Sequence, residues 1–201
     1  MFVALLRRGL LPDEGTLLDL GCGQGLLLSL LRAAKEQHAA GRWPRDWPAP
    51  PRRLALRGID AHARRVEIAR RALGDDAHIE ERDLREVDVP QPCAVVVLLD
   101  VLLYLPEDEP ARLLRNAARA LAPGGIILLR EPDAGGGLAF RLTRFGSWFD
   151  SLTRRKPRAP IHYRSAAHWR AELRHAGFTV ETQPASQGTP FANVLFVGRK
   201  P

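Results

Sequence analysis

The residues of this sequence best suited to chemistry lie in the run Leu18–Gly25, which reads Asp-x-Gly-x-Gly-x-Gly from Asp19. Glycines let a backbone turn tightly and approach a ligand, because no Cβ stands in the way. The dinucleotide-binding pattern Gly-x-Gly-x-x-Gly would need its last glycine at position 26, where this chain has Leu26. The carboxylate of Asp19 would also repel a pyrophosphate. The run therefore favours a ligand with a positively charged amino-acid end and no phosphates.

Three further acids each follow or close a short aliphatic run: Asp60, Asp83 and Asp100. In doubly wound sheets the active site lies at the carboxyl ends of the strands, which is where these acids would fall. A carboxylate has two oxygens, so it can accept one hydrogen bond from each hydroxyl group of a diol with good geometry. Acids at such positions are also common helix N-caps, so this alternative stands beside the functional one.

The elements that would position these acids alternate along the chain. Strands are predicted at 16–20, 54–60, 79–82, 94–99 and 126–129, and helices at 26–37, 63–73 and 107–121. This alternation is typical of a parallel sheet covered by helices. A helix at 166–176 is then followed by strands at 178–182 and 194–198, whose connection is too short for a crossover helix, so these two strands should pair antiparallel.

In their order and content these motifs resemble those of the class I S-adenosylmethionine-dependent methyltransferases, from about Leu11 to the C-terminus. The resemblance implies that the loop glycines wrap the amino-acid end of the cofactor, and that Asp19 holds its ammonium group directly or through water. The residues concerned in that loop are Gly21, Cys22, Gly23 and Gly25. Cys22 also suits a purely packing role.

The same resemblance implies the remaining cofactor contacts. Asp60 would accept hydrogen bonds from both ribose hydroxyls, with Ala61 beside it. Asp83 would accept from the adenine amino group, with Leu84 against the ring. The stretch 99–105, which begins Leu-Asp100, would line the methyl donor.

The fold implied by the resemblance is an α/β three-layer sandwich. Its seven-stranded mixed sheet would have the order 3-2-1-4-5-7-6, with the last strand antiparallel and helices on both faces. We expect one methyltransferase domain over residues 1–201, with a proline-rich insertion at 41–53 and a lid-like insertion at 134–164. The expected cofactor is S-adenosylmethionine, with S-adenosylhomocysteine as product. No metal is expected, since the six histidines show no ligand spacing.

Methyl transfer from a sulfonium needs mainly alignment and exclusion of water, and a base only where the acceptor has a proton to lose. Candidate polar groups near the methyl are Asp100, Tyr104 and Glu131, and Tyr104, Glu131, His162 and Tyr163 are candidates for holding the acceptor. None is assigned as catalytic. The stretch 100–103 lacks the Asn/Asp-Pro-Pro-aromatic motif of enzymes that methylate base amino groups, which favours the small-molecule branch of the family. By this resemblance the acceptor would be a small organic molecule of the secondary-metabolite or quinone type. The acceptor and the methylated atom stay open.

A basic, amphipathic segment at 138–158 carries an apolar stripe at helical spacing surrounded by arginines and a lysine. It could simply pack on the domain. The functional interpretations are a lid over the acceptor, a membrane-surface helix, or a dock for an acidic carrier protein. We hypothesise a lid with an anionic or carrier-linked acceptor.

Composition bounds the alternatives. The chain of 201 residues has a formal net charge of +7, but the charge is divided into basic and acidic blocks, unlike a nonspecific nucleic-acid coat. An RNA methyltransferase therefore stays the same-class alternative and nucleic acid is not favoured as a partner. Asp19 and Leu26 oppose a nicotinamide oxidoreductase. Because few residues precede the first strand, where small-molecule enzymes often carry a substrate cap, the start could be truncated or the chain a non-catalytic, cofactor-binding partner subunit.

The two cysteines form no disulfide framework and no apolar run has the length of a membrane span, so a cytoplasmic location is expected.

Overall fold

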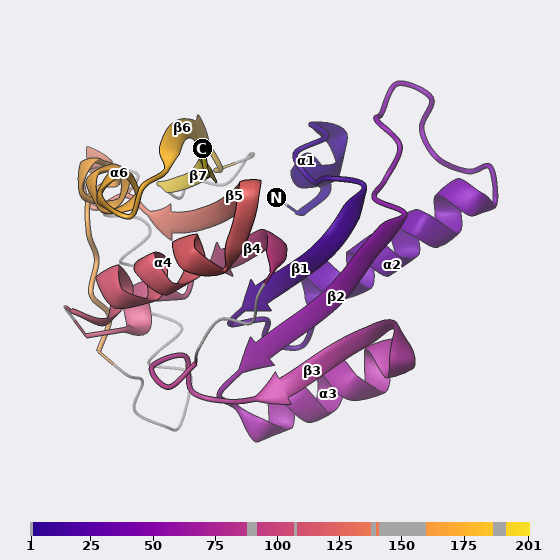
Figure 1. Cartoon of the computed structure of the whole chain (residues 1–201), viewed down its shortest axis with the longest axis horizontal. Coiled ribbons are helices and arrows are strands. Elements are labelled where there is room, and N and C mark those ends of the chain that lie inside the picture. The colour runs from indigo at the N-terminus through magenta and orange to yellow at the C-terminus, as the bar shows by residue number, and fades with distance from the viewer. Residues whose placement is uncertain (1, 88–91, 107, 138–139, 141–159, 187–191) are drawn as a thin grey trace.

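The computed structural model describes residues 2–87, 92–106, 108–137, 140, 160–186 and 192–201. These residues form a seven-stranded sheet in the order β3-β2-β1-β4-β5-β7-β6 (Figure 1). The strands are β1 (Glu14–Leu20), β2 (Arg53–Asp60), β3 (Ala77–Glu81), β4 (Cys93–Leu99), β5 (Leu121–Pro132), β6 (Thr179–Pro184) and β7 (Asn193–Arg199). The expected strand order is confirmed.

Strand direction follows the length of each connection. The pairs β1·β2, β1·β4, β2·β3 and β4·β5 are parallel, and helices or long loops connect the strands. β7 runs antiparallel to both of its neighbours, β5 and β6. The carboxyl ends of β1 to β5 therefore meet at one edge of the sheet, which is where the predicted site residues fall.

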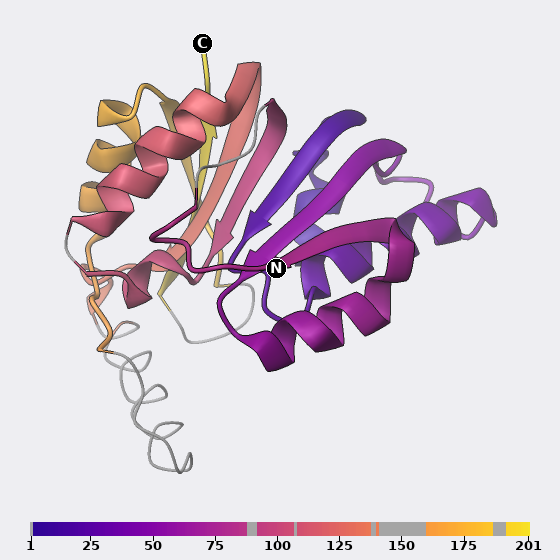
Figure 2. The ribbon, with the colours of Figure 1, turned by 60° about the horizontal axis from the view of Figure 1, so that its bottom comes forward.

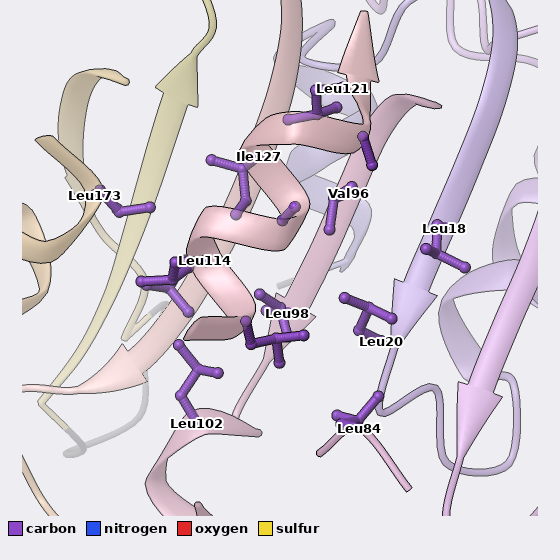
Figure 3. Packing of buried hydrophobic residues seen from close by; sticks show 14 of the residues in the cluster. Leu18, Leu20, Leu84, Val96, Leu98, Leu102, Leu114, Leu121, Ile127 and Leu173 are labelled. Carbon is purple, nitrogen blue, oxygen red and sulfur yellow. The ribbon is translucent and has the colours of Figure 1, made fainter. Parts of the chain in front are cut away.

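Helices cover both faces of the sheet. They are α1 (Phe2–Arg7), α2 (Leu26–Ala39), α3 (Ala63–Leu73), α4 (Glu109–Ala120) and α6 (Ala166–His175). Neighbouring residues of one strand point to opposite faces, so Leu17 packs with α1, α2 and α3 while Leu18 packs with α4 and α6. Figure 2 shows α4 and α6 side by side. Figure 3 shows Leu114 of α4 against the sheet residues Leu98 and Ile127. The three-layer α/β sandwich is confirmed.

Two elements differ from the prediction. Helix α1 was not predicted, because six residues are too few for a helical period, yet its Leu5 and Leu6 are buried against α2. Strand β5 begins at Leu121 rather than at 126, so the Pro-Gly-Gly turn lies within it, where the register with β4 breaks between Cys93 and Val95. The pattern of apolar and turn-forming residues in the sequence does not predict that the strand continues through this irregularity, because that depends on hydrogen bonds to β4.

The proline-rich insertion is a loop, as expected, at the end of the sheet opposite the arrowheads of β1 and β2 (Figure 1). Trp43 fastens it, because its ring packs on the core and its Nε1–H donates to the carbonyl of Pro48 at 2.9 Å. Most of the basic segment 138–158 lies outside the described residues. Among the described helices, none has both the length and the apolar character to cross a membrane.

Candidate functional site

The loop between β1 and α2 has a shape that requires glycine. Gly21 and Gly25 have φ angles of +81° and +75°, in the left-handed region that side chains disfavour. A Cβ on Gly21 would lie 2.5 Å from Cγ2 of Val101, and one on Gly25 would lie 2.9 Å from Cδ1 of Leu73. The N–H of Gly21 also donates to the carbonyl of Ile59 at 2.7 Å. These contacts hold the loop against β2, α3 and the segment after β4.

Gly23 differs from Gly21 and Gly25 because there is space where its Cβ would lie. Its φ is +57°, but no atom of the described residues lies within 4 Å of the place its Cβ would take. Its N–H donates to Oδ2 of Asp60 at 2.9 Å. The tip of the loop is thus held by its hydrogen bond to Asp60, while the other side of Gly23 is open. This arrangement is suited to a backbone that contacts a ligand.

Asp19 supplies a buried carboxylate below this loop. It is 4% exposed and lies level with Gly58 and Val97 in the neighbouring strands. Within the described part of the chain, no residue donates a hydrogen bond to it. Burial, and to a smaller extent the charge of Asp60, raises the pKa of Asp19 to about 7. A buried carboxylate is costly without a partner, so this position suits a ligand that brings a cation or a donor.

Asp60, at the end of β2, ties the loop to its own strand. Its carboxylate is buried, accepts from the N–H of Gly23, and through Oδ1 accepts from the N–H of His62 at 2.9 Å. A carboxylate has about four acceptor sites, so each oxygen keeps capacity for one further donor. Ala61, the next residue, is exposed. The geometry leaves Asp60 able to accept from two adjacent hydroxyls.

Cys22 does not direct its side chain to the loop's open side. Its Sγ would lie 2.8 Å from a Cβ on Gly58, and the side chain is buried in the core with Ile79. Its carbonyl accepts from the N–H of Gly25 at 2.9 Å. Burial raises the pKa of its thiol to about 12. The side chain of Cys22 therefore has the packing role that the sequence suggested, and a cofactor contact at this position would have to come from its backbone.

Asp83 and Leu84 lie at the carboxyl edge of the sheet, as predicted, but their side chains contact other parts of the protein. The N–H of Arg82 donates to the carbonyl of Asp60 at 3.2 Å, which places this loop beside the end of β2. Asp83 accepts from the backbone N–H and the guanidinium of Arg85, and these bonds lower its pKa. Leu84 is 7% exposed and packs in the core near Leu20 (Figure 3). A ligand reaching Asp83 would share it with Arg85.

Asp100 follows β4 in a strained conformation. Among the described residues, it is the one non-glycine residue with a positive φ, at +59°. Its carboxylate forms a two-pronged ion pair with Arg130, in which Nε lies 2.9 Å from Oδ1. Burial lowers the pKa of the Arg130 guanidinium. Sequence reasoning missed Arg130, although an arginine beside Glu131 at the end of an aliphatic strand was a visible signal.

Glu131 is not an open acceptor-facing group, which corrects the expectation for it. It is 1% exposed, and its Oε1 accepts from the N–H groups of Val101 and Leu102 at 3.1 and 2.7 Å. Burial raises its pKa to about 8 despite these bonds. Glu131 thus caps the 3-10 helix Leu102–Tyr104, since the first amides of a helix have no partner within it.

The acceptor candidates gather next to that 3-10 helix. Tyr104 is 38% exposed at its end. The backbone N–H of His162 donates to the carbonyl of Leu103 at 2.8 Å, which brings the following stretch alongside. The ring of Tyr163 stacks edge-on with Phe140, with 5.1 Å between centroids. These residues lie along the same edge as Asp100.

A cavity of about 610 Å³ lies elsewhere, between α4, α6 and the end of β7. Its basic lining residues include Arg119 and Lys200, which sit at helix C-termini, where cations stabilise the helix dipole. Lys200 donates to the carbonyl of Leu121, just after α4. None of the described residues that line this cavity is an acid or belongs to the loop between β1 and α2, so the carboxyl edge is the better candidate site.

The strand order, the glycine loop and the acids at the strand ends together define a class I methyltransferase fold. The chain belongs to the family described as "Methyltransferase domain", which it matches over residues 2–183. Within the described residues, no group of three or more His, Cys, Asp or Glu side chains could hold a metal ion.

Named relatives are similar over only part of their length. A trans-aconitate 2-methyltransferase from Azoarcus sp. is 30% identical over 171 residues, covering 84% of this chain and 59% of the relative. A carboxy-S-adenosyl-L-methionine synthase from Chromohalobacter salexigens is 32% identical and covers 56% of this chain and 38% of the relative. A solved S-adenosylmethionine-dependent methyltransferase from Mesorhizobium loti has a TM-score of 0.66 at 20% identity, covering 96% of this chain and 95% of that one. The chain thus spans about half the length of these two curated relatives.

Proposed function

We propose that the protein binds S-adenosylmethionine at the carboxyl edge of the sheet and transfers its methyl group to a small organic acceptor. The observation that carries this proposal is the buried Asp19 carboxylate, to which no described residue donates a hydrogen bond, beneath a glycine loop whose tip is open at Gly23. An ammonium group on the ligand would supply the charge partner that this carboxylate lacks.

The residues present fit the amino-acid end and the ribose of this cofactor. Asp19 would pair with its ammonium, the backbone of Gly23 would adjoin its amino-acid end, and Asp60 has acceptor capacity for two ribose hydroxyls. When bound, the cofactor supplies an electrophilic methyl on a sulfonium. The protein's part is to align the acceptor and to keep water out, and Tyr104 and His162 are the groups we propose for it.

One relative and the charge of the chain support an anionic acceptor. The Azoarcus relative is named for trans-aconitate, a small polyanion. This agrees with the anionic acceptor that the basic stretch at 138–158 led us to expect. A dock for an acidic carrier protein or a membrane surface through that stretch is a further part of the proposal. Since Cys22 and Cys93 are both buried and are not joined in a disulfide, we also propose a cytoplasmic location.

Binding and turnover can be tested separately. Calorimetry with S-adenosylmethionine, S-adenosylhomocysteine and NAD should give saturable binding of the first two and none of NAD. S-adenosylhomocysteine release would then be followed with a panel of trans-aconitate, catechol and an amino sugar nucleotide. Folded protein that takes up neither adenosyl compound would refute the proposal. Binding without turnover of any acceptor would indicate a non-catalytic partner subunit.

Cofactor affinity should depend on pH in a bell shape. Because the pKa of Asp19 is raised to about 7, the carboxylate is protonated below that pH and must lose its proton before it can pair with an ammonium. Affinity for S-adenosylhomocysteine should therefore rise by about tenfold per pH unit up to pH ~7, and fall again at alkaline pH, where the ligand's α-amino group loses its proton. Without ligand, the raised pKa means that Asp19 stabilises the fold when protonated, and this contribution is lost as the pH rises through about 7.

Calorimetric titrations across this range would measure the effect, with Asp19→Asn as the matched control. The variant should bind more weakly than the wild type at neutral pH and lack the acidic limb. A flat acidic limb in the wild type would show that Asp19 does not pair with the ligand.

A further inference from the structure

Two consecutive residues at the end of β5 hold three consecutive amides after β4. The carbonyl of Arg130 accepts from the N–H of Asp100 at 2.8 Å. Oε1 of Glu131 accepts from the N–H groups of Val101 and Leu102. The guanidinium of Arg130 adds its ion pair with the Asp100 side chain. The segment after β4 is thereby fastened through both its backbone and its first side chain.

This arrangement is costly. Glu131 is almost fully buried, and within the described part of the chain its Oε2 has no hydrogen-bond partner. A helix is ordinarily capped by an Asp, Asn or Ser at its N-cap; here the N-cap is Val101, and Asp100, one residue earlier, is the nearest residue of that type. Asp100 instead pairs with Arg130, in a strained backbone conformation. A distant buried carboxylate and a strained residue together hold a turn that a local cap could have held.

What the fastened segment carries explains why its position matters. Tyr104 projects from the end of the 3-10 helix, and the carbonyl of Leu103 holds the backbone of His162. Val101 lies against Gly21, 2.5 Å from the place of a Cβ there. A shift of this segment would therefore move both proposed acceptor contacts and one wall of the glycine loop.

We propose that Glu131 is a positioning residue for methyl transfer, which fixes Tyr104 and His162 by holding the amides of Val101 and Leu102 without touching the acceptor. The inference rests on the proposed function of the same site. It assigns to the buried end of β5 the alignment on which a displacement reaction depends, since a misplacement of about 1 Å can cost about 100-fold in rate.

Two substitutions separate the amide contacts from the ionisation of the carboxyl group. Glu131→Gln keeps the Oε1 acceptor and removes the titratable proton, and Glu131→Met keeps the volume but removes the acceptor. Glu131→Met leaves the N–H groups of Val101 and Leu102 without this acceptor, which costs stability, so thermal unfolding must first show that the variant folds. Glu131→Asp, which keeps the carboxyl group but shortens the reach by one methylene, serves if it does not. Glu181→Ala, on the exposed strand β6, is the surface control.

Three measurements would be made on each variant: S-adenosylhomocysteine affinity by calorimetry, amide exchange of residues 100–105, and kcat and KM with trans-aconitate or whichever acceptor of the panel is turned over. Glu131→Met should exchange its Val101 and Leu102 amides at least about tenfold faster and lose about tenfold or more in kcat, with cofactor affinity changed by less than about threefold. Glu131→Gln and the surface control should stay near the wild type.

Faster exchange in Glu131→Met with kcat unchanged would overturn the inference while leaving the proposed function intact. A loss of kcat in Glu131→Gln as large as in Glu131→Met would also overturn it, because the amide acceptor would then not be the cause. Wild-type protein that binds no cofactor or turns over no acceptor would refute the transferase function, and the inference with it.

Discussion

Gly23→Ala is expected to reduce the affinity for S-adenosylhomocysteine by about 100-fold or more while the protein stays folded. A methyl group at this position meets no protein atom, so the fold has room for it. The proposed cofactor would occupy that same space, and an alanine would hold the ligand away from the loop and from Asp19. Calorimetry on the purified variant measures the loss, and thermal unfolding measures the stability.

Gly41→Ala is a closely matched control. Gly41 also has a positive φ, +69° against +57° for Gly23, and also has no atom within 4 Å of its Cβ position, but it lies in the proline-rich loop far from the site. Each alanine should cost about 1 kcal/mol of folding stability for its left-handed backbone. Only the Gly23 variant should lose cofactor affinity. If both variants bind the cofactor equally well, the ligand does not bind at this loop.

Asp60→Ala should have an effect of similar size for a different reason. The variant loses the acceptor for two proposed ribose hydroxyls, and hydrogen bonds to a charged group contribute about 1.5–3 kcal/mol each. It also leaves the N–H groups of Gly23 and His62 without their acceptor, so the loop itself loosens. We expect a loss in affinity of at least about 100-fold together with a lower Tm.

Adenosine distinguishes the roles of the two buried acids, since it carries the ribose but no ammonium group. Asp60→Ala should lose adenosine affinity as well, whereas Asp19→Asn should keep it. Asp46→Ala, an exposed acid in the proline-rich loop, is the control for loss of a negative charge. If Asp60→Ala binds adenosine as tightly as the wild type, Asp60 does not hold the ribose.

Much of the fold could be predicted because aliphatic runs and glycine breaks are local. Helix α3 begins and ends where its pattern predicted, and the acids Asp19 and Asp60 come together because parallel strands end at one edge. Helix α1 was not predicted because its burial depends on contact with α2, and the sequence of six residues does not reveal that contact.

The direction in which a side chain points at a strand end could not be predicted. Glu131, near the end of β5, and Asp100, just after the neighbouring β4, are both carboxylic acids, yet Glu131 turns into the protein to cap a 3-10 helix and Asp100 pairs with Arg130. The outcome depends on which donors the fold brings within reach. The same applies to Asp83, whose donors come from Arg85 two residues later.

The proline-rich loop makes this chain well suited to site-specific labelling. The two native thiols of the chain, Cys22 and Cys93, are buried, and burial raises the pKa of both. Neither should therefore react readily with maleimides at neutral pH. A cysteine introduced at the exposed Ala49 would then be the single reactive thiol. A fluorophore attached there would sit at the opposite end of the sheet from the proposed cofactor site, and would report on tumbling or complex formation without blocking that site.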